Sequence, residues 1–81
     1  MKTFHLTIAK VGENLFDGEA VSVTLPGVAG EFTVLAHHEP FVSQLKKGDV
    51  RVKDAEGKTR TIAVDASGVA EISHNQATVL L

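Results

Sequence analysis

Apolar and polar residues alternate along several short stretches of the chain. Near the N-terminus, Phe4, Leu6 and Ile8 alternate with smaller or polar neighbours, and the same period of two recurs in residues 20–25 and 49–53. Successive side chains of a strand point to opposite faces, so this period predicts strands with one buried and one solvent-facing side. Branched valine, isoleucine and threonine side chains, which suit a pleated surface, are abundant. Further strands are expected at residues 15–17, 31–35, 41–45, 59–65, 69–73 and 77–80.

Turn-forming residues separate these stretches at intervals of about 8 to 12 residues. Glycine, proline or asparagine marks turns at residues 12–14, 17–18, 26–27, 47–49, 56–57, 67–68 and 74–76. This spacing is typical of a β-sandwich or flattened barrel, and the apolar spacing of an amphipathic helix is not sustained anywhere. The pattern predicts an all-β fold, a flattened sandwich or barrel of about 8 to 10 short strands. We expect a single domain over residues 1–81.

The composition narrows the classes of protein and partner. With 43% hydrophobic and 22% charged residues, the chain is too apolar for a disordered tail. It has no cysteine, so neither a disulfide nor a thiolate metal site can stabilise the fold. A formal charge of −2 and the lack of tyrosine and tryptophan predict no nucleic-acid partner. No apolar run approaches the ~20 residues of a membrane span, and no export signal is visible, which predicts a cytoplasmic domain without direct membrane insertion.

Histidines and scattered carboxylates are the candidate chemical groups. His37 and His38 are neighbours, so on an extended strand their rings would point to opposite faces and could not bind one metal ion together. His5 and His74 fall in other elements, and the acidic residues lie mainly at expected turns. The chain has neither a Gly-X-Ser-X-Gly elbow nor a glycine-rich phosphate loop with Lys followed by Ser or Thr. We therefore expect no catalysis, no cofactor, no metal site and no small-molecule substrate.

A carrier domain of the lipoyl or biotinyl type is an alternative from another class. Such domains are also small flattened β-barrels, and they carry a modified lysine at a hairpin tip. Lys58 follows the Glu56-Gly57 turn and has a comparable setting. Its neighbours differ from the Asp-Lys-Ala or Met-Lys-Met settings of those families, and the simpler interpretation is a solvated turn lysine. A generic interaction module in an unrelated assembly is a third reading.

Several short motifs in a fixed order carry a resemblance to a known family. The densest block is residues 30–48, in which Gly30-Glu31-Phe32 precedes a polar loop with His38 and Pro40. The other motifs are Phe4-His5-Leu6-Thr7-Ile8, Leu15-Phe16-Asp17-Gly18, Val23-Thr24-Leu25-Pro26-Gly27, Lys47-Gly48 with Val50-Arg51-Val52, and Gly68-Val69-Ala70-Glu71-Ile72 with Asn75 and Ala77-Thr78-Val79-Leu80. Together they resemble the N-terminal β-domain of the epsilon subunit of F-type rotary ATP synthases over nearly the whole chain.

Three features depart from the pattern of that family. Its members usually have Pro-Gly before the loop histidine, where this chain has Ala36-His37, so the loop is expected to turn less sharply. They usually have Gly-Gly where this chain has Ser67-Gly68. Many continue beyond the position of Leu81 into a helical hairpin associated with inhibition of ATP hydrolysis and, in some members, with ATP binding. The resemblance therefore covers the β-domain only and implies neither of those activities.

The resemblance implies a non-catalytic rotor subunit of the central stalk. In that family the β-domain binds the gamma subunit, touches the polar loops of the membrane c-ring, and couples proton or sodium flow to ATP synthesis. The resemblance also implies a peripheral location on the cytoplasmic face of the inner (plasma) membrane, as part of the ATP synthase complex. No cofactor is implied.

The resemblance further implies which residues contact each partner. Glu31 and His38 would face the c-ring loops, and the residues toward gamma would be Pro40, Phe41, Val42, Ser43 and Leu45. Glu31 opens an expected strand, and His38 lies in the connection that follows it. We expect antiparallel strands joined there to bring both side chains to one end of the sandwich.

Overall fold

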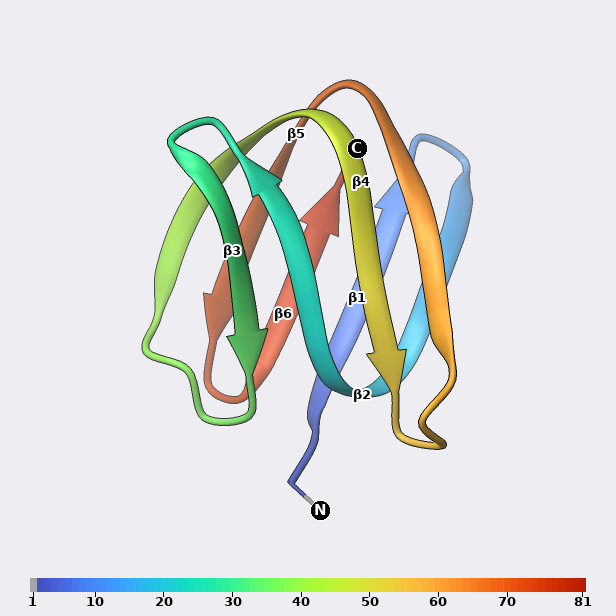
Figure 1. Ribbon diagram of the computed structural model, residues 1–81, viewed down its shortest axis with the longest axis vertical. Helices are drawn as coiled ribbons and strands as arrows, with labels where there is room; N and C mark the ends of the chain where they lie inside the picture. The colour runs from blue at the N-terminus through green and yellow to red at the C-terminus, as the bar shows by residue number, and fades with distance from the viewer. Residues whose placement is uncertain (1) are drawn as a thin grey trace.

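Six β-strands build the protein, and the computed structural model describes them over residues 2–81 (Figure 1). The strands are β1 (Phe4–Lys10), β2 (Glu13–Gly27), β3 (Gly30–Leu35), β4 (Phe41–Asp54), β5 (Thr59–Ser73) and β6 (Gln76–Leu80). They pair in the order β1-β6-β5-β4-β2-β3, and an additional pairing of β1 with β2 closes five of them into a barrel. The expected all-β sandwich is confirmed. Within the described range, no helix is long and apolar enough to cross a membrane.

The strands are fewer and longer than the alternation suggests. β2 continues through Asp17-Gly18, β4 through Lys47-Gly48 and β5 through Ser67-Gly68, all of which the sequence marks as turns. The pairing of β4 with β5 shifts register between Lys46 and Gly48, and an extra residue of this kind lets a strand bend without ending. Several expected pairs of short strands are therefore single bent strands that contribute to both layers of the sandwich (Figure 1).

Two glycines allow the close contacts at these bends. A Cβ atom on Gly48 would lie 2.9 Å from the Cβ of Pro26, and one on Gly68 would lie 2.7 Å from the carbonyl oxygen of Leu80. Both distances are shorter than a carbon side chain tolerates, so a larger residue would push the strands apart. Glycine at these positions therefore serves close strand packing inside the barrel.

The core lies between the two layers and is filled by alternate residues of each strand. The expected set on β1, Phe4, Leu6 and Ile8, is at most 1% exposed. The other buried apolar residues are Ala20, Val23, Leu25, Val34, Leu45, Val50, Val52, Val64, Ala70, Ile72, Ala77 and Val79. Because burial of a large aliphatic or aromatic side chain contributes about 1.5 to 3 kcal/mol, this core is the main source of stability.

One side of the sandwich remains outside the closed barrel. β3 pairs with β2 alone and forms the edge of its sheet. Residues 36–40, called the 36–40 loop below, lead from β3 to β4 at the lower end of Figure 1, and the turn between β2 and β3 lies at the upper end. On this side Phe32 and Phe41 pack edge to face, with ring centroids 5.3 Å apart. All residues that the resemblance selects lie on or near this side.

Candidate functional site

Glu31 lies at the start of β3 on the outer face of its sheet. Its carboxylate oxygen Oε1 is 3.2 Å from Nη2 of Arg51 on β4, and both side chains are about half exposed. An exposed ion pair contributes only about 0 to 1 kcal/mol. The pair therefore orients the Glu31 carboxylate on the surface more than it stabilises the fold.

His38 lies beyond the opposite end of β3, in the 36–40 loop (Figure 1). The structure thus separates Glu31 from His38, and the expectation that they share one end of the sandwich is wrong. The reason is connectivity, because most of the six-residue strand β3 lies between them and a strand rises about 3.3 Å per residue. The two residues cannot form one compact contact.

The His38 side chain instead belongs with the segment that follows it. Its ring centroid lies 5.0 Å from that of Phe41. Its Nδ1 atom is 2.9 Å from the carbonyl oxygen of Glu39, and because a carbonyl only accepts, this nitrogen carries the proton. The backbone N–H of His38 donates to the carbonyl of Leu35 at 3.3 Å. These contacts fold the loop back on the start of β4.

The residues expected to face gamma do not all lie on one face, because side chains alternate between the two sides of β4. Val42 is 65% exposed and Pro40 is exposed, whereas Phe41 and Ser43 are half-buried. Leu45 is 1% exposed and belongs to the core. Alternate strand residues face opposite sides, so Leu45 points inward and cannot serve as a surface contact. We therefore remove Leu45 from the candidate contact residues.

Asn75 ties the 36–40 loop to the rest of the molecule, and the sequence did not single it out as a site residue. Its side-chain Oδ1 accepts a hydrogen bond of 2.7 Å from the backbone N–H of His37. Its Nδ2 donates to the carbonyl of Thr3 at 2.9 Å, and its own carbonyl accepts from the N–H of His5 at 3.2 Å. Asparagine in a hairpin turn signals turn chemistry, but these partners are distant in sequence.

A cross-strand cluster surrounds His5 on the outer face of β1 and β2. Its Nε2 lies 2.7 Å from Oδ1 of Asp17, and its Nδ1 lies 3.3 Å from Oε2 of Glu19. The hydrogen bond with Asp17 is the main cause of a pKa for His5 above its ordinary value of 6.5; the interactions with Glu19 also raise this pKa, and partial desolvation lowers it. Among residues 2–81, no group of three or more histidine, aspartate or glutamate side chains is arranged to hold a metal ion.

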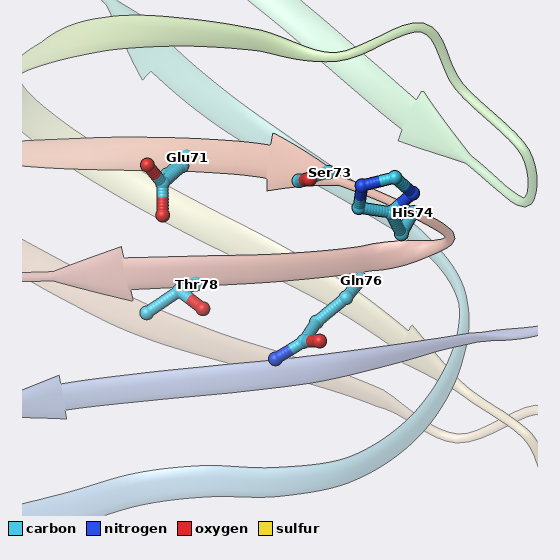
Figure 2. A pocket seen from close by; sticks show the side chains of 5 residues that line it. All are labelled: Glu71, Ser73, His74, Gln76 and Thr78. Atoms are coloured by element: carbon cyan, nitrogen blue, oxygen red, sulfur yellow. The ribbon is translucent and has the colours of Figure 1, made fainter.

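The outer face of the β5–β6 hairpin carries a shallow depression of about 220 Å³ (Figure 2). Its lining residues are Glu71, Ser73, His74, Gln76 and Thr78. All five are polar, and none is buried. In the part of the chain that the structure describes, no buried side-chain nitrogen or oxygen lacks a hydrogen-bond partner. The depression therefore has the character of an open polar surface.

Lys58, the residue that a carrier domain would modify, lies in the turn between β4 and β5. Its backbone N–H donates to Oδ1 of Asp54 at 2.9 Å, as does the N–H of Glu56. The Asp54 side chain, only 9% exposed, thus closes the turn from within. The lysine side chain is exposed, as expected for a turn residue.

Comparison with known proteins favours the resemblance to ATP synthase epsilon subunits over a carrier domain or a generic interaction module. Residues 3–81 match the family described as "ATP synthase, Delta/Epsilon chain, beta-sandwich domain". The chain belongs to this family. Two curated relatives are ATP synthase epsilon chains, from Delftia acidovorans (38% identical) and from Bordetella petrii (39% identical), each aligned over 80 residues. The alignments cover 99% of this chain but only 57% and 56% of these relatives, so the chain spans little more than half of their length.

Solved structures agree with the family. A chain of the Euglena gracilis mitochondrial ATP synthase, in a structure described as OSCP/F1/c-ring in rotational state 1, superposes with a TM-score of 0.88 at 25% identity. This match covers 96% of the present chain and 49% of the other. A chain from the central stalk and c-ring of the Tetrahymena thermophila mitochondrial ATP synthase has a TM-score of 0.80 at 7% identity, over 98% and 63% of the two chains, and shows likeness of fold alone. The resemblance to epsilon subunits is confirmed.

Proposed function

We propose that this chain is a non-catalytic rotor subunit of an F-type ATP synthase that links the gamma subunit to the c-ring and couples ion flow to ATP synthesis. The observation that carries the proposal is the family match over residues 3–81. Similarity to ATP synthase epsilon chains over 99% of the sequence supports it. The structural likeness to a chain of an F1/c-ring assembly adds to this. In this role the domain is peripheral to the membrane, on its cytoplasmic face.

The two partners occupy opposite ends of β3 in this proposal. Glu31 lies beside the turn between β2 and β3, whose tip carries Val28, an apolar residue that is 55% exposed. We assign this end to the polar loops of the c-ring. His38, which was expected at the c-ring contact, lies too far from Glu31 to share it, and it packs on Phe41, which continues into the exposed Val42. We therefore reassign His38 to the gamma end, together with Pro40 and Ser43. A domain that bridges two partners needs separated contacts, and β3 supplies the separation.

The test is retention on rotor complexes that contain gamma and the c-ring but have been depleted of their own epsilon subunit. We expect the unaltered chain to be retained. Glu31→Lys removes a charged contact and should weaken retention about tenfold, the equivalent of about 1.4 kcal/mol. Glu56→Lys, a matched charge reversal in the turn between β4 and β5, should leave retention unchanged.

Stability measurements accompany this test. Both substitutions alter exposed side chains, and Glu31→Lys also removes an ion pair with Arg51, so each should change the free energy of unfolding by no more than about 1 kcal/mol. Failure of the unaltered chain to bind would refute the rotor function. Equal retention of both variants would refute the assignment of Glu31 to the c-ring and leave the rotor function standing.

A mass measurement tests the carrier alternative. Protein purified from its own organism should have the mass of the unmodified sequence, allowing for loss of the initiator methionine. A lipoyl- or biotin-sized increment on Lys58 would favour a carrier domain instead. The family match supports the first outcome.

A further inference from the structure

We propose that Asn75 is a positioning residue that holds the 36–40 loop in the conformation that binds gamma. The inference rests on the proposed function for its partner, but the locking of the loop can be measured without that partner. Asn75 lies in the turn between β5 and β6, on a different hairpin from the loop. Its part in partner binding is therefore indirect, through the backbone that it fixes.

Both the oxygen and the nitrogen of the Asn75 side-chain amide form hydrogen bonds. The oxygen Oδ1 accepts from His37 N–H at 2.7 Å, and the nitrogen Nδ2 donates to the Thr3 carbonyl at 2.9 Å. Each end meets the only kind of group it can bond, a donor for the oxygen and an acceptor for the nitrogen. One side chain thus joins three segments: the β5–β6 turn, the residues before β1, and the 36–40 loop.

The backbone of the turn restricts which residue can make this bridge. Asn75 has φ +58° and its neighbour His74 has φ +49°, in the left-handed region where glycine, asparagine and aspartate are the easiest residues to place. Glycine would satisfy the backbone but would remove both side-chain bonds. Aspartate would keep the acceptor for His37 and would set a carboxylate against the Thr3 carbonyl. Asparagine alone among these three satisfies the backbone and both partners.

The hydrogen bond to Asn75 fixes the position of the 36–40 loop relative to the barrel. Its bonds with nearby residues, from His38 N–H to Leu35 and between His38 Nδ1 and Glu39, close a local turn. Local bonds of this kind move with the loop, whereas the bond from His37 to Asn75 anchors the loop to the barrel. His37 itself has φ +61°, a left-handed conformation that is unfavourable for a residue with a side chain. A strained loop of this kind needs an outside contact to keep one conformation.

Anchoring of the loop controls affinity through the fraction of molecules that are ready to bind. The observed dissociation constant equals the intrinsic constant divided by that fraction. His38 and Phe41, which follow the anchored residue, carry the surface that we assign to gamma. If release of the anchor leaves about one molecule in ten with the loop in place, affinity falls about tenfold.

Three variants separate the side-chain bridge from the demands of the turn. Asn75→Gly keeps the positive φ and removes both side-chain bonds. Asn75→Asp keeps the acceptor for His37 and loses the donor to Thr3. His74→Gly is the matched control, because it changes the adjacent residue of the same turn and leaves the Asn75 amide intact.

The first readout is amide hydrogen exchange of the free chain, followed by NMR. In the unaltered chain the His37 amide should exchange slowly for a loop residue, because it donates to Asn75. We expect at least about tenfold faster exchange at His37 in Asn75→Gly if the locked fraction falls as above. Exchange at His37 should stay near the unaltered rate in Asn75→Asp and in His74→Gly.

The second readout is affinity for gamma-bearing rotor complexes. Asn75→Gly should bind about tenfold more weakly, while Asn75→Asp restores most of the affinity and His74→Gly binds normally. A purely structural role would lower the melting temperature without this rescue. The amides in the centre of β5 and β6 should keep their protection in all three variants.

Two results would overturn the inference. If His37 exchange does not change in Asn75→Gly, Asn75 does not lock the loop. If exchange rises but affinity is unchanged, the locked conformation is not the one that binds gamma. Failure of the unaltered chain to bind gamma is a different result: it refutes the rotor function and, with it, the binding role of the loop.

Discussion

The two connections at the ends of β4 are held in opposite ways. The turn after β4 is closed by Asp54, the last residue of that strand, because its Oδ1 accepts from the N–H groups of Glu56 and Lys58, both at 2.9 Å. The loop before β4 is anchored by Asn75, a residue 38 positions from its partner His37. One connection is a local structure, and the other depends on the assembled barrel.

Because of this difference, we expect the Asp54 turn to contribute to the stability of the fold and the 36–40 loop to the positioning of contact residues. A self-closed turn forms as soon as a few neighbouring residues adopt their conformation, so it can help to bring β4 and β5 into register. The anchored loop can form only after β1, the β5–β6 hairpin and β3 have come together. We therefore expect changes in the Asp54 turn to alter mainly the free energy of unfolding, and changes in the loop to alter mainly binding.

The largest expected effect comes from the local turn. Asp54→Ala removes the acceptor for two backbone N–H groups in a partly buried setting, and it also removes the carboxylate whose Oδ2 lies 3.8 Å from Nε of Arg60. Loss of such bonds costs about 2 to 3 kcal/mol together, which lowers the melting temperature by roughly 10 to 20 °C for a domain of this size.

Asp49→Ala is the control for this change. It removes an exposed carboxylate from the same strand and should alter stability by less than about 0.5 kcal/mol. Chemical denaturation of the two variants measures the difference. Equal stability of both would mean that the Asp54 turn contributes no more than the exposed surface does, and the contrast between the two connections would fail.

A smaller effect is expected from relief of strain in the loop. His37→Gly keeps the N–H that donates to Asn75 and removes the side chain that disfavours φ +61°. The relief of about 1 to 2 kcal/mol is offset by the greater freedom of glycine in the unfolded chain. We expect a net change between about 0 and 1 kcal/mol of stabilisation.

Urea unfolding of the His37→Gly and Asn75→Gly variants, measured side by side, tests whether His37→Gly is stabilised. Asn75→Gly should be destabilised by about 1 kcal/mol through its lost hydrogen bonds. Destabilisation of His37→Gly by the same amount would show that the His37 side chain, and not the backbone bond, holds the loop.

The smallest expected effect is a pH dependence on the outer face of β1 and β2, next to the anchor. The His5 ring lies between Asp17 and Glu19, and the backbone N–H of His5 donates to the Asn75 carbonyl. The hydrogen bond with Asp17 raises the pKa of His5 in the folded protein. The stabilisation of the fold by the protonated His5 is therefore fully present below the pKa of His5 in the unfolded chain, about 6.5. It is lost as the pH rises through the higher pKa of His5 in the folded protein.

Thermal melts between pH 5.5 and pH 8.5 measure this dependence, and NMR titration of the His5 ring gives its pKa directly. The side chains of His5 and its partners are about half exposed, so the slope should be shallow and should shrink further in high salt. Asp17→Asn should lower the pKa of His5 and flatten the melting curve against pH. A His5 pKa that is unchanged in Asp17→Asn would contradict the pairing.

The sequence by itself determined the fold class and part of the core. The period of two that places Phe4, Leu6 and Ile8 on one face follows from strand geometry alone, and the structure buries all three. The Glu56-Gly57 turn could also be predicted from the sequence, because the residues that form it are neighbours in the chain. The family resemblance was also carried by the order of short motifs along the chain.

The tertiary structure alone decided where strands bend and which distant residues meet. Gly48 and Gly68 read as turn residues, yet they lie inside continuous strands, because register shifts and close approach to neighbouring strands appear only when the sheet closes. Leu45 was expected to contact gamma, and the inward alternation of β4 buries it. Glu31 and His38 were expected together, and the length of β3 separates them. The bridge from Asn75 to His37 spans 38 residues, and no local rule links two such positions before the barrel has brought them into contact.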